Sequence, residues 1–374
     1  MLVCLLVACC SSLVAQESPI GLYVNPDIDT SNVHIAQVIR IWNSYLNSNP
    51  DSVYDNPWWL SLEKKEYRKF DFLNTVYFTP SLYYFLRYYK PTIMSVTPTD
   101  SSYIIRMLFA SQTNSGFSRP FCIIRIMAIK VDSSYRLCNI LCFNTRSWPT
   151  EKIGSITYRF SPSHRFDPAL AEKMNAFIDT LTAIWHIKPF PTEFYLADDL
   201  SQIMHLVGFD FYVGESENRG TGGLADIANR IVYGAGQNEW YPHEFVHLYI
   251  NPLFPKAHYY FLEGYAALLG GSKGHELSWH AKRMQKYLDL HPDLDLDSLL
   301  TISHFDSETD PKYVFGGLLC KLALDEGGLA KLRQLFSFGT SDKDFYNAIE
   351  TVFALKQSNL NSFIRTKLAE YARE

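Results

Sequence analysis

The sequence has few cysteines, no block of charge of one sign, and no long apolar run after its first residues. Three of its seven cysteines lie in residues 1–15, and the other four show neither a C-x-x-C pair nor zinc-knuckle spacing. The formal charge is only −5, and there is no basic block or interleaving of basic and aromatic residues, which argues against a nucleic-acid partner. Buried free thiols, rather than a disulfide framework, are expected at Cys122, Cys138, Cys142 and Cys320.

The N-terminal segment, residues 1–15, is apolar but too short for a transmembrane anchor, and no later stretch reaches membrane-spanning length without charges. The segment resembles the core of a signal peptide, although a positively charged start is missing. Cleavage after Ala15 would give a secreted or periplasmic protein. Two alternatives remain: lipidation at Cys9, because Leu6-Val-Ala-Cys9 resembles a lipoprotein signal, and a cytosolic protein with an apolar N-terminus.

The length of 374 residues, with 47% hydrophobic content, predicts a folded chain of two or three domains and an α+β fold. Residues 16–160 are expected to form a small N-terminal α+β domain, for which an NTF2-like fold is one candidate. We assign this domain no chemistry and expect it to provide packing support, with substrate or partner binding as the alternative. Helices are predicted over residues 32–46 and 80–90, followed by strands over Tyr103–Ala110, Phe121–Val131 and Tyr135–Phe143, with a hairpin turn at Asp132-Ser-Ser134.

Residues 161–374 are expected to form a second domain that ends in a mainly helical part over residues 276–374. A glycine-rich stretch at residues 214–223 lacks the Gly-Lys-Ser/Thr of a phosphate loop and predicts a mobile rim loop. The other predicted elements are a helix from residue 168 to about 188, a strand at 194–196, a helix at 200–206, a strand at 231–233, and helices at 242–250, 259–270, 276–290, 312–325, 328–337, 341–351 and 359–372.

The stretch over residues 241–252, Tyr-Pro-His-Glu-Phe-Val-His-Leu-Tyr-Ile-Asn-Pro, contains the pattern H-E-x-x-H. His243 and His247 are four residues apart, so a helix places both imidazoles on one face, where they can bind a single Zn²⁺. Glu244 flanks them and can take a proton from a water molecule. The proline at the start and the Asn-Pro at the end bound this helix, and its other side chains are apolar. Buried polar groups need partners, and a metal ion is the simplest one here.

A catalytic zinc usually has three protein ligands, so a third must be found. The metzincin pattern would place it at position 253, which is Leu253. The next candidate is Glu263, the only acid in an apolar segment over residues 258–271 that reads as a second helix. A lone carboxylate on a mostly buried helix is costly unless it is paired or bound to metal, whereas the alternative is an exposed glutamate on a polar side.

H-E-F-V-H followed after a short loop by F-L-E-G-Y-A resembles the gluzincin metallopeptidases, whose third ligand is a glutamate in such a segment. The resemblance implies that Glu263 is the third metal ligand, after His243 and His247. The resemblance also covers the segment starting Tyr313-Val-Phe-Gly-Gly. In aminopeptidase-like members a tyrosine ahead of a glycine donates its hydroxyl to the tetrahedral intermediate, which makes Tyr313 the candidate donor and His304 a reserve. The longer pattern H-E-F-x-H-x-x-x-N-P resembles uncharacterised bacterial secreted families more closely still.

The chain departs from the gluzincin pattern at two points. The thermolysin branch carries a second acid four residues after its ligand glutamate, where this chain has Ala267. The G-x-M-E-N segment with which aminopeptidases hold a substrate amino terminus is missing, and the stretch at residues 222–226 does not replace it. Exopeptidase activity is therefore unsupported.

The sequence predicts an extracytoplasmic zinc metallopeptidase with one Zn²⁺ ion, acting on a peptide or protein substrate. His243, His247 and Glu263 would hold the metal, which activates a water molecule. Glu244 would take the proton of that water and deliver it to the leaving amine, while Tyr313 donates to the developing oxyanion. The alternatives are a secreted or lipid-anchored binding protein with a structural or inactive zinc site, and a zinc amidase that acts on a non-protein substrate.

Overall fold

The computed structural model describes residues 20–48, 57–66, 88–213, 220–302, 305–306 and 308–373. The predicted leader over residues 1–15, with its alternative lipid site Cys9, lies outside these residues, as do His304 and most of the predicted helix over 80–90. Within the described ranges, none of the helices combines the length and apolar character needed to cross a membrane. The fold class is α+β, as predicted, with two mixed sheets.

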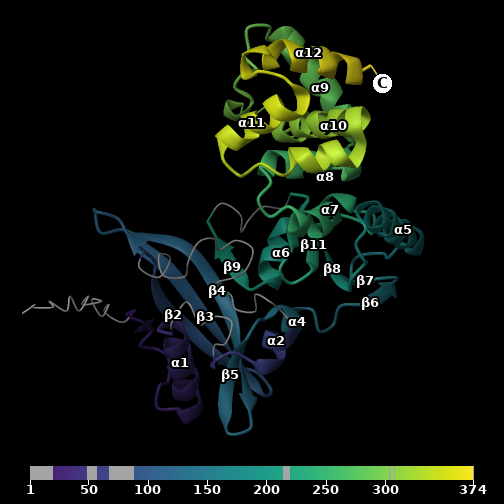
Figure 1. Cartoon of the computed structure of the whole chain (residues 1–374). Helices are drawn as coiled ribbons and strands as arrows, with labels where there is room; N and C mark the ends of the chain where they lie inside the picture. The colour runs from purple at the N-terminus through teal and green to yellow at the C-terminus, as the bar shows by residue number, and fades with distance from the viewer. Residues whose placement is uncertain are drawn as a thin grey trace, which may run out of the picture.

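The first sheet has the strand order β1-β2-β3-β4-β5, and its core is filled from one side by the predicted first helix (Figure 1). That helix, α1 (Val33–Leu46), begins at Asn32, whose side chain accepts from the amides of the first turn, and it buries Val38 and Trp42. The strands are β1 (Tyr23–Val24), β2 (Lys90–Pro98), β3 (Ser102–Gln112), β4 (Ser118–Val131) and β5 (Ser134–Cys138).

The third strand predicted from the sequence is shorter than expected. The hairpin turn is confirmed, since β4 and β5 pair up to Val131 and Ser134 and Asp132 has a φ of 53°. The strand ends at Cys138, however, because the next residue gives its backbone N–H to the carboxylate of Glu63 in α2 (Ser61–Glu66). Residues 141–144 then form α4 (Leu141–Asn144), so Cys142 is exposed, whereas the other three described thiols are free and buried.

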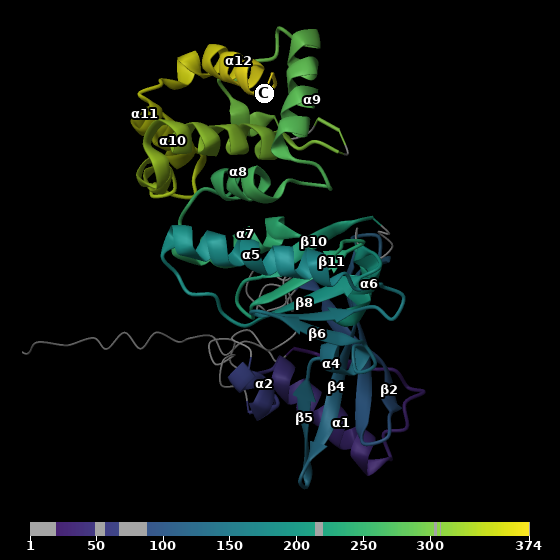
Figure 2. The same ribbon diagram turned by 90° about the vertical axis from the view of Figure 1, so that its right-hand side faces the viewer.

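The second sheet has the order β10-β11-β8-β7-β6, in which β11, β8 and β7 are parallel neighbours. Alternate side chains of β8 point to opposite faces. Phe194 and Leu196 belong to the large core with residues of α5 and α7, whereas Tyr195 and Ala197 pack with residues of α6. Figure 2 shows α5 and α7 together on one side of this sheet. The elements are β6 (Thr150–Ile153), β7 (Ile156–Phe160), α5 (Pro168–Trp185), β8 (Thr192–Ala197), α6 (Leu200–Leu206), β10 (Gly222–Asp226) and β11 (Ile231–Ala235).

The domain boundary predicted at residue 160 does not separate the two sheets, because strands of each sheet lie on both sides of it in the sequence. β6 and β7 precede it and belong to the second sheet, whereas β9 (Phe209–Tyr212) follows it and pairs with β4 of the first sheet. Asp210 in β9 makes ion pairs with Arg106 and Arg125 of β3 and β4, at 2.6 and 2.7 Å. A strand and a charge cluster therefore tie the second region to the first.

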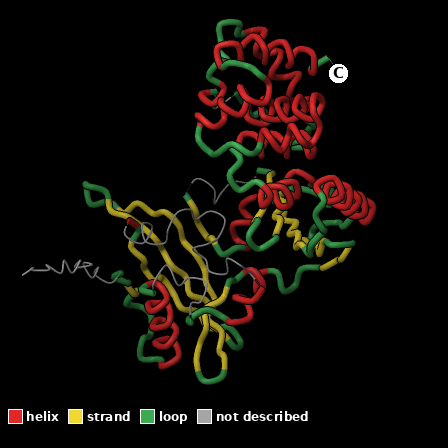
Figure 3. The backbone as a smooth tube through the Cα atoms, viewed as in Figure 1, coloured by secondary structure: helices red, strands yellow, loops and turns green. Residues whose placement is uncertain are grey.

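The last part of the chain is helical, as predicted, and lies on the far side of the second sheet from the first sheet (Figures 1 and 3). The two predicted helices over 312–325 and 328–337 form one element, α10, with a break at Gly328, where φ is 60°. The helices are α7 (Pro242–Ile250), α8 (Tyr259–Gly270), α9 (Leu277–Leu290), α10 (Pro311–Leu335), α11 (Asp342–Phe353) and α12 (Leu360–Tyr371).

Candidate metal centre

The two predicted metal helices, α7 and α8, pack against each other in the large core of the second region. Every residue of α7 is buried, and Pro242 occupies its first turn, where a missing N–H costs nothing. The short 3₁₀ turn Asn251–Leu253 reverses the chain, so that the last turn of α8 meets the first turn of α7. Gly270 is required at this contact, because a Cβ there would overlap the backbone of His243.

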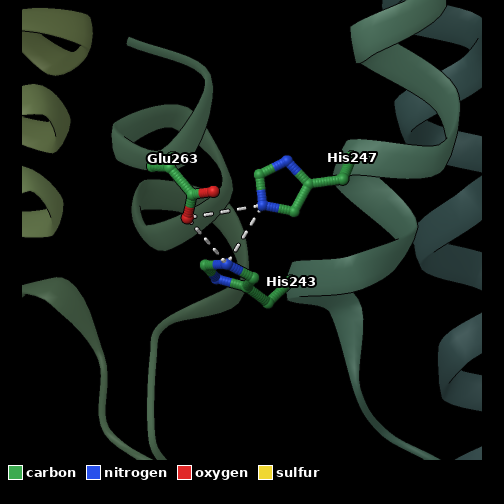
Figure 4. A group of neighbouring side chains, drawn as sticks. All are labelled: His243, His247 and Glu263. Carbon is green, nitrogen blue, oxygen red and sulfur yellow. Dashed lines mark hydrogen bonds and ion pairs between the residues drawn. The ribbon is translucent and has the colours of Figure 1, made fainter. Parts of the chain in front are cut away.

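This packing brings His243, His247 and Glu263 together, as the sequence predicts (Figure 4). One potential ligand atom from each of the three lies within 4.8 Å of the others. The two Nε2 atoms are 3.2 Å apart, and the Glu263 Oε2 lies 3.8 Å from that of His243 and 3.6 Å from that of His247. The group could hold a metal ion. Leu253, at the metzincin position, is 39% exposed.

The Nδ1 atoms of both imidazoles already have hydrogen-bond partners, and this determines the protonation of the Nε2 atoms. Nδ1 of His243 lies 2.6 Å from the carbonyl oxygen of Gly271, and Nδ1 of His247 lies 3.4 Å from the amide oxygen of Asn251. These oxygens only accept, so each Nδ1 carries the proton and each neutral ring presents an Nε2 lone pair inward. Two lone pairs and a carboxylate oxygen then face one another, an arrangement that calls for a cation.

The pKa directions show the same demand for positive charge. Burial lowers the pKa of His247, but the hydrogen bond and charge of Glu263, with the charge of Glu244, outweigh it and raise the pKa. Burial raises the pKa of Glu263, and the two histidines overcome this and hold it far below its ordinary value. Glu263 is therefore ionised at neutral pH, and a proton or a metal ion on the imidazoles can compensate its charge.

Glu244 lies beside this group without being one of the three clustered ligands. Its residue is 8% exposed, and it lines a cleft of about 380 Å³ together with His243. The hydroxyl of Tyr241 lies 3.5 Å from Glu244 Oε1 and donates toward it. The walls of the cleft come from the start of β10, the segment before α7, the hairpin after α8, and the first turn of α10, at Thr221, Gly222, Gly223, Gln237, Trp240, Tyr241, Pro242, Gly270, Gly271, Ser272, Lys273, Gly274, His275, Glu276 and Tyr313.

Tyr313 reaches the cleft because α8 and α10 touch backbone to backbone. Gly264 of α8 faces Gly316 and Gly317 of α10, and a Cβ on Gly264 would overlap the backbone of both. Tyr313 lies one turn earlier in α10, with its ring 5.7 Å from that of His243 and nearly perpendicular to it. Burial raises the pKa of Tyr313, and the charges of Glu263, Asp310 and Glu244 add to this, so its hydroxyl keeps its proton and can donate it.

Several groups at the site were not identified from the sequence. The sequence predicts Asn251 only as a helix stop, although its position four residues after His247 is a usable signal for a partner of that ring. Tyr241 carries no motif, and Gly271 acts through a backbone carbonyl that side-chain patterns cannot reveal.

The strand predicted over residues 231–233 lies inside the sheet, as part of β11. β11 is paired with β10 on one side and with β8 on the other, so it has no free edge. The strand next to the cleft is β10, which falls partly within the stretch predicted as a rim loop, and Gly222 and Gly223 line the cavity directly. Residues 214–219 of that stretch lie outside the described residues.

A scan against protein-family models finds no match to this chain, and neither does a search of curated protein sequences.

Proposed function

We propose that the protein is a zinc-dependent hydrolase of the gluzincin type that cleaves peptide bonds, with one Zn²⁺ held by His243, His247 and Glu263. The observation that carries this proposal is the convergence of three nitrogen and oxygen ligands, one of which, His243, lines a cleft together with an acid that is not a ligand. Catalytic zinc sites typically have three such ligands and one open position, whereas structural sites are closed by four. The lone pairs directed inward by Gly271 and Asn251 fit a divalent cation.

In this proposal the metal supplies a Lewis acid that polarises a carbonyl and lowers the pKa of water. Glu244 accepts a proton from the attacking water and passes it to the leaving amine. Tyr241 orients the Glu244 carboxylate by donating to Oε1. Tyr313 keeps its own proton and donates a hydrogen bond to the oxyanion that forms on the substrate carbonyl.

The shape of the cleft supports an extended peptide as the substrate. β10 pairs with β11 along one edge and is the terminal strand of the second sheet among the described residues. A peptide in extended conformation can add to such an edge by main-chain hydrogen bonds. Gly222 and Gly223 of this strand line the cleft. A flexible or unfolded segment therefore suits this cleft better than the surface of a folded domain.

The decisive experiment compares wild type with Glu244→Gln for bound zinc and for cleavage of a mixed unfolded-protein substrate. We expect wild type to bind one zinc, and Glu244→Gln to bind zinc equally but to lose activity by about a hundred- to ten-thousandfold, because the proton acceptor is gone. Glu276→Gln is the matched control, since the same change is made in the exposed wall of the same cleft.

Three results would count against the proposal. A wild type without stoichiometric zinc contradicts the metal site. Zinc binding without hydrolysis of any amide favours a binding protein with an inactive site. Cleavage of non-protein amides alone would keep the metal chemistry and replace the substrate.

A further inference from the structure

The segment after α8 forms a tight hairpin, residues 271–276, which we call the cleft hairpin. The N–H of Ser272 donates to the carbonyl of His275 at 2.8 Å, and the N–H of His275 donates back at 2.9 Å. Lys273 and Gly274 have φ values of 48° and 78°, as a two-residue turn of type I′ requires. The ring of His275 stacks on Trp279 at 3.7 Å. The hairpin therefore has one defined conformation.

The cleft hairpin touches the proposed site at two places. The Gly271 carbonyl oxygen accepts a hydrogen bond from Nδ1 of His243 at 2.6 Å, which fixes the tautomer and orientation of that ring. Ser272, next to Gly271, lines the same cleft as Tyr313. One short segment thus holds a proposed metal ligand and borders the cleft beside the proposed oxyanion donor.

His280, fully buried in the first turns of α9, holds this hairpin in place. Its Nε2 lies 2.9 Å from the Ser272 carbonyl oxygen, and its Nδ1 lies 3.0 Å from the hydroxyl of Thr309. The carbonyl can only accept, so Nε2 carries the proton and Nδ1 accepts from the threonine. Thr309 also accepts from Arg283 Nε at 3.1 Å, and its backbone N–H donates to Asp306 at 2.7 Å.

Thr309 directly precedes Asp310, the N-cap residue of α10, so it stands at the start of the helix that carries Tyr313. His280 therefore ties together the two segments that approach the site from the helical part: the cleft hairpin and the beginning of α10. A histidine that merely filled core space would not need both ring nitrogens bonded to these two segments.

We propose that His280 is a positioning residue for the metal centre: it orients His243 through the cleft hairpin, and through Thr309 it holds the start of the helix that carries Tyr313. This inference rests on the proposed zinc site. It adds a residue that lies outside the cleft lining and outside the H-E-x-x-H and glutamate segments. Removing its bonds should loosen the Gly271 carbonyl from His243 and so weaken metal binding without removing any ligand.

The test measures zinc affinity by chelator competition for wild type, His280→Leu, His280→Gln, Thr309→Val and Thr309→Ser. We expect zinc affinity to fall about 10- to 100-fold in His280→Leu, the range seen when an outer-shell partner is lost. His280→Gln keeps a donor toward Ser272 and should recover part of this loss. Thr309→Val should weaken binding less than His280→Leu, and Thr309→Ser should bind like wild type because it keeps the hydroxyl.

Thr182→Val is the matched control, since Thr182 is also a buried threonine with a bonded hydroxyl but lies in α5. It should lower the unfolding temperature without changing zinc affinity. The absorption spectrum of the Co²⁺-loaded proteins gives a second measurement, because a reoriented His243 changes the band shape, whereas a loss of stability alone does not.

Wild-type zinc affinity and an unchanged cobalt spectrum in both His280→Gln and Thr309→Val would overturn the inference while leaving the proposed function intact. If His280→Leu fails to fold, these two variants decide the matter. A wild type that binds no zinc would instead overturn the proposed function, and the inference with it.

Discussion

Two glutamates, one in each region of the molecule, point inward and meet opposite surroundings. Glu63, beside the first sheet, is 6% exposed and accepts from Trp59 Nε1 at 2.7 Å and from the backbone and side-chain nitrogens of Asn139 at 3.0 to 3.1 Å. Glu263, in the helical region, meets the Nε2 atoms of two histidines whose protons are on the other side of the ring. The first carboxylate is complete within the protein, and the second needs a cation.

This difference teaches how to separate a structural acid, the buried Glu63, from a functional one, the half-buried Glu263. A buried carboxylate surrounded by N–H donors fixes the local fold, as Glu63 does at the end of β5. A carboxylate surrounded by acceptors is unfavourable unless a ligand is bound. Glu244 lies between these two cases, because among the described residues its carboxylate accepts from a single hydroxyl, at 3.5 Å.

The largest effect that separates the two acids is expected from the paired variants Glu263→Ala and Glu63→Ala. Glu263→Ala removes a proposed ligand, so zinc affinity should fall by more than about a hundredfold, beyond the loss typical of outer-shell partners. Glu63→Ala should leave zinc affinity unchanged and lower the free energy of unfolding by about 1 to 3 kcal/mol, because donors lose their acceptor. Chelator competition and urea unfolding of both variants measure this. Equal zinc affinity in the two would end the distinction.

The variant Tyr241→Phe sharpens the intermediate case of Glu244. The ring would stay in place, against the backbone of Gly223, while the donor to Glu244 Oε1 is lost. We expect kcat to fall about tenfold at unchanged zinc content, since a hydrogen bond to a charged group contributes about 1.5 to 3 kcal/mol and this one is long. Steady-state kinetics on a peptide substrate measures it, with Tyr233→Phe in β11 as a control. A change in KM alone would contradict the assigned contact.

The smallest effect is a pH dependence confined to the helical region. His258, at the N-terminus of α8, is 2% exposed, and burial lowers its pKa against the opposing charges of Asp342 and Asp344. A lowered pKa in the folded state means that the unfolded chain takes up the proton first as the pH falls below about 6.5. Stability should therefore be unaffected above that pH and decrease below it. Metal-free unfolding curves at pH 5 and 8 measure this, and His258→Asn should flatten the difference.

Much of the site could be predicted because its signals are local in sequence. The bounds of α7 follow from the proline before His243 and the Asn-Pro after it, and Glu263 stood out as the only acid in an apolar helix. Tyr313 came only from a resemblance, but the structure brings it to the cleft. The remaining parts of the site could not be predicted, because they depend on contacts between segments that are distant in sequence. These are the contact of the Gly271 carbonyl with His243 and that of His280 with Thr309.

The same holds for the fold: elements with local sequence signals could be predicted, and pairings between distant segments could not. Helix positions in the last third of the chain were predicted well, because apolar periodicity specifies them directly. The sheets were not, since strand order and edges arise from pairing across the chain. β10 contains two glycines and no strongly apolar alternation, so its role as terminal strand was not visible, and nothing in residues 209–212 indicated that β9 would join the first sheet.

The glycine contact between α8 and α10 has a consequence for how such a cleft could change over time. Where two helices meet through Gly264, Gly316 and Gly317, there is no side chain that can change rotamer to alter the spacing. The spacing between the helix that carries Glu263 and the helix that carries Tyr313 is therefore set by the two backbones. New specificities would have to arise elsewhere in the lining, as at Thr221 and Gly222 at the start of β10, where a Cβ on Gly222 would make only ordinary contacts. One side of the cleft is bound to conserve the reaction, while the other is free to change what enters it.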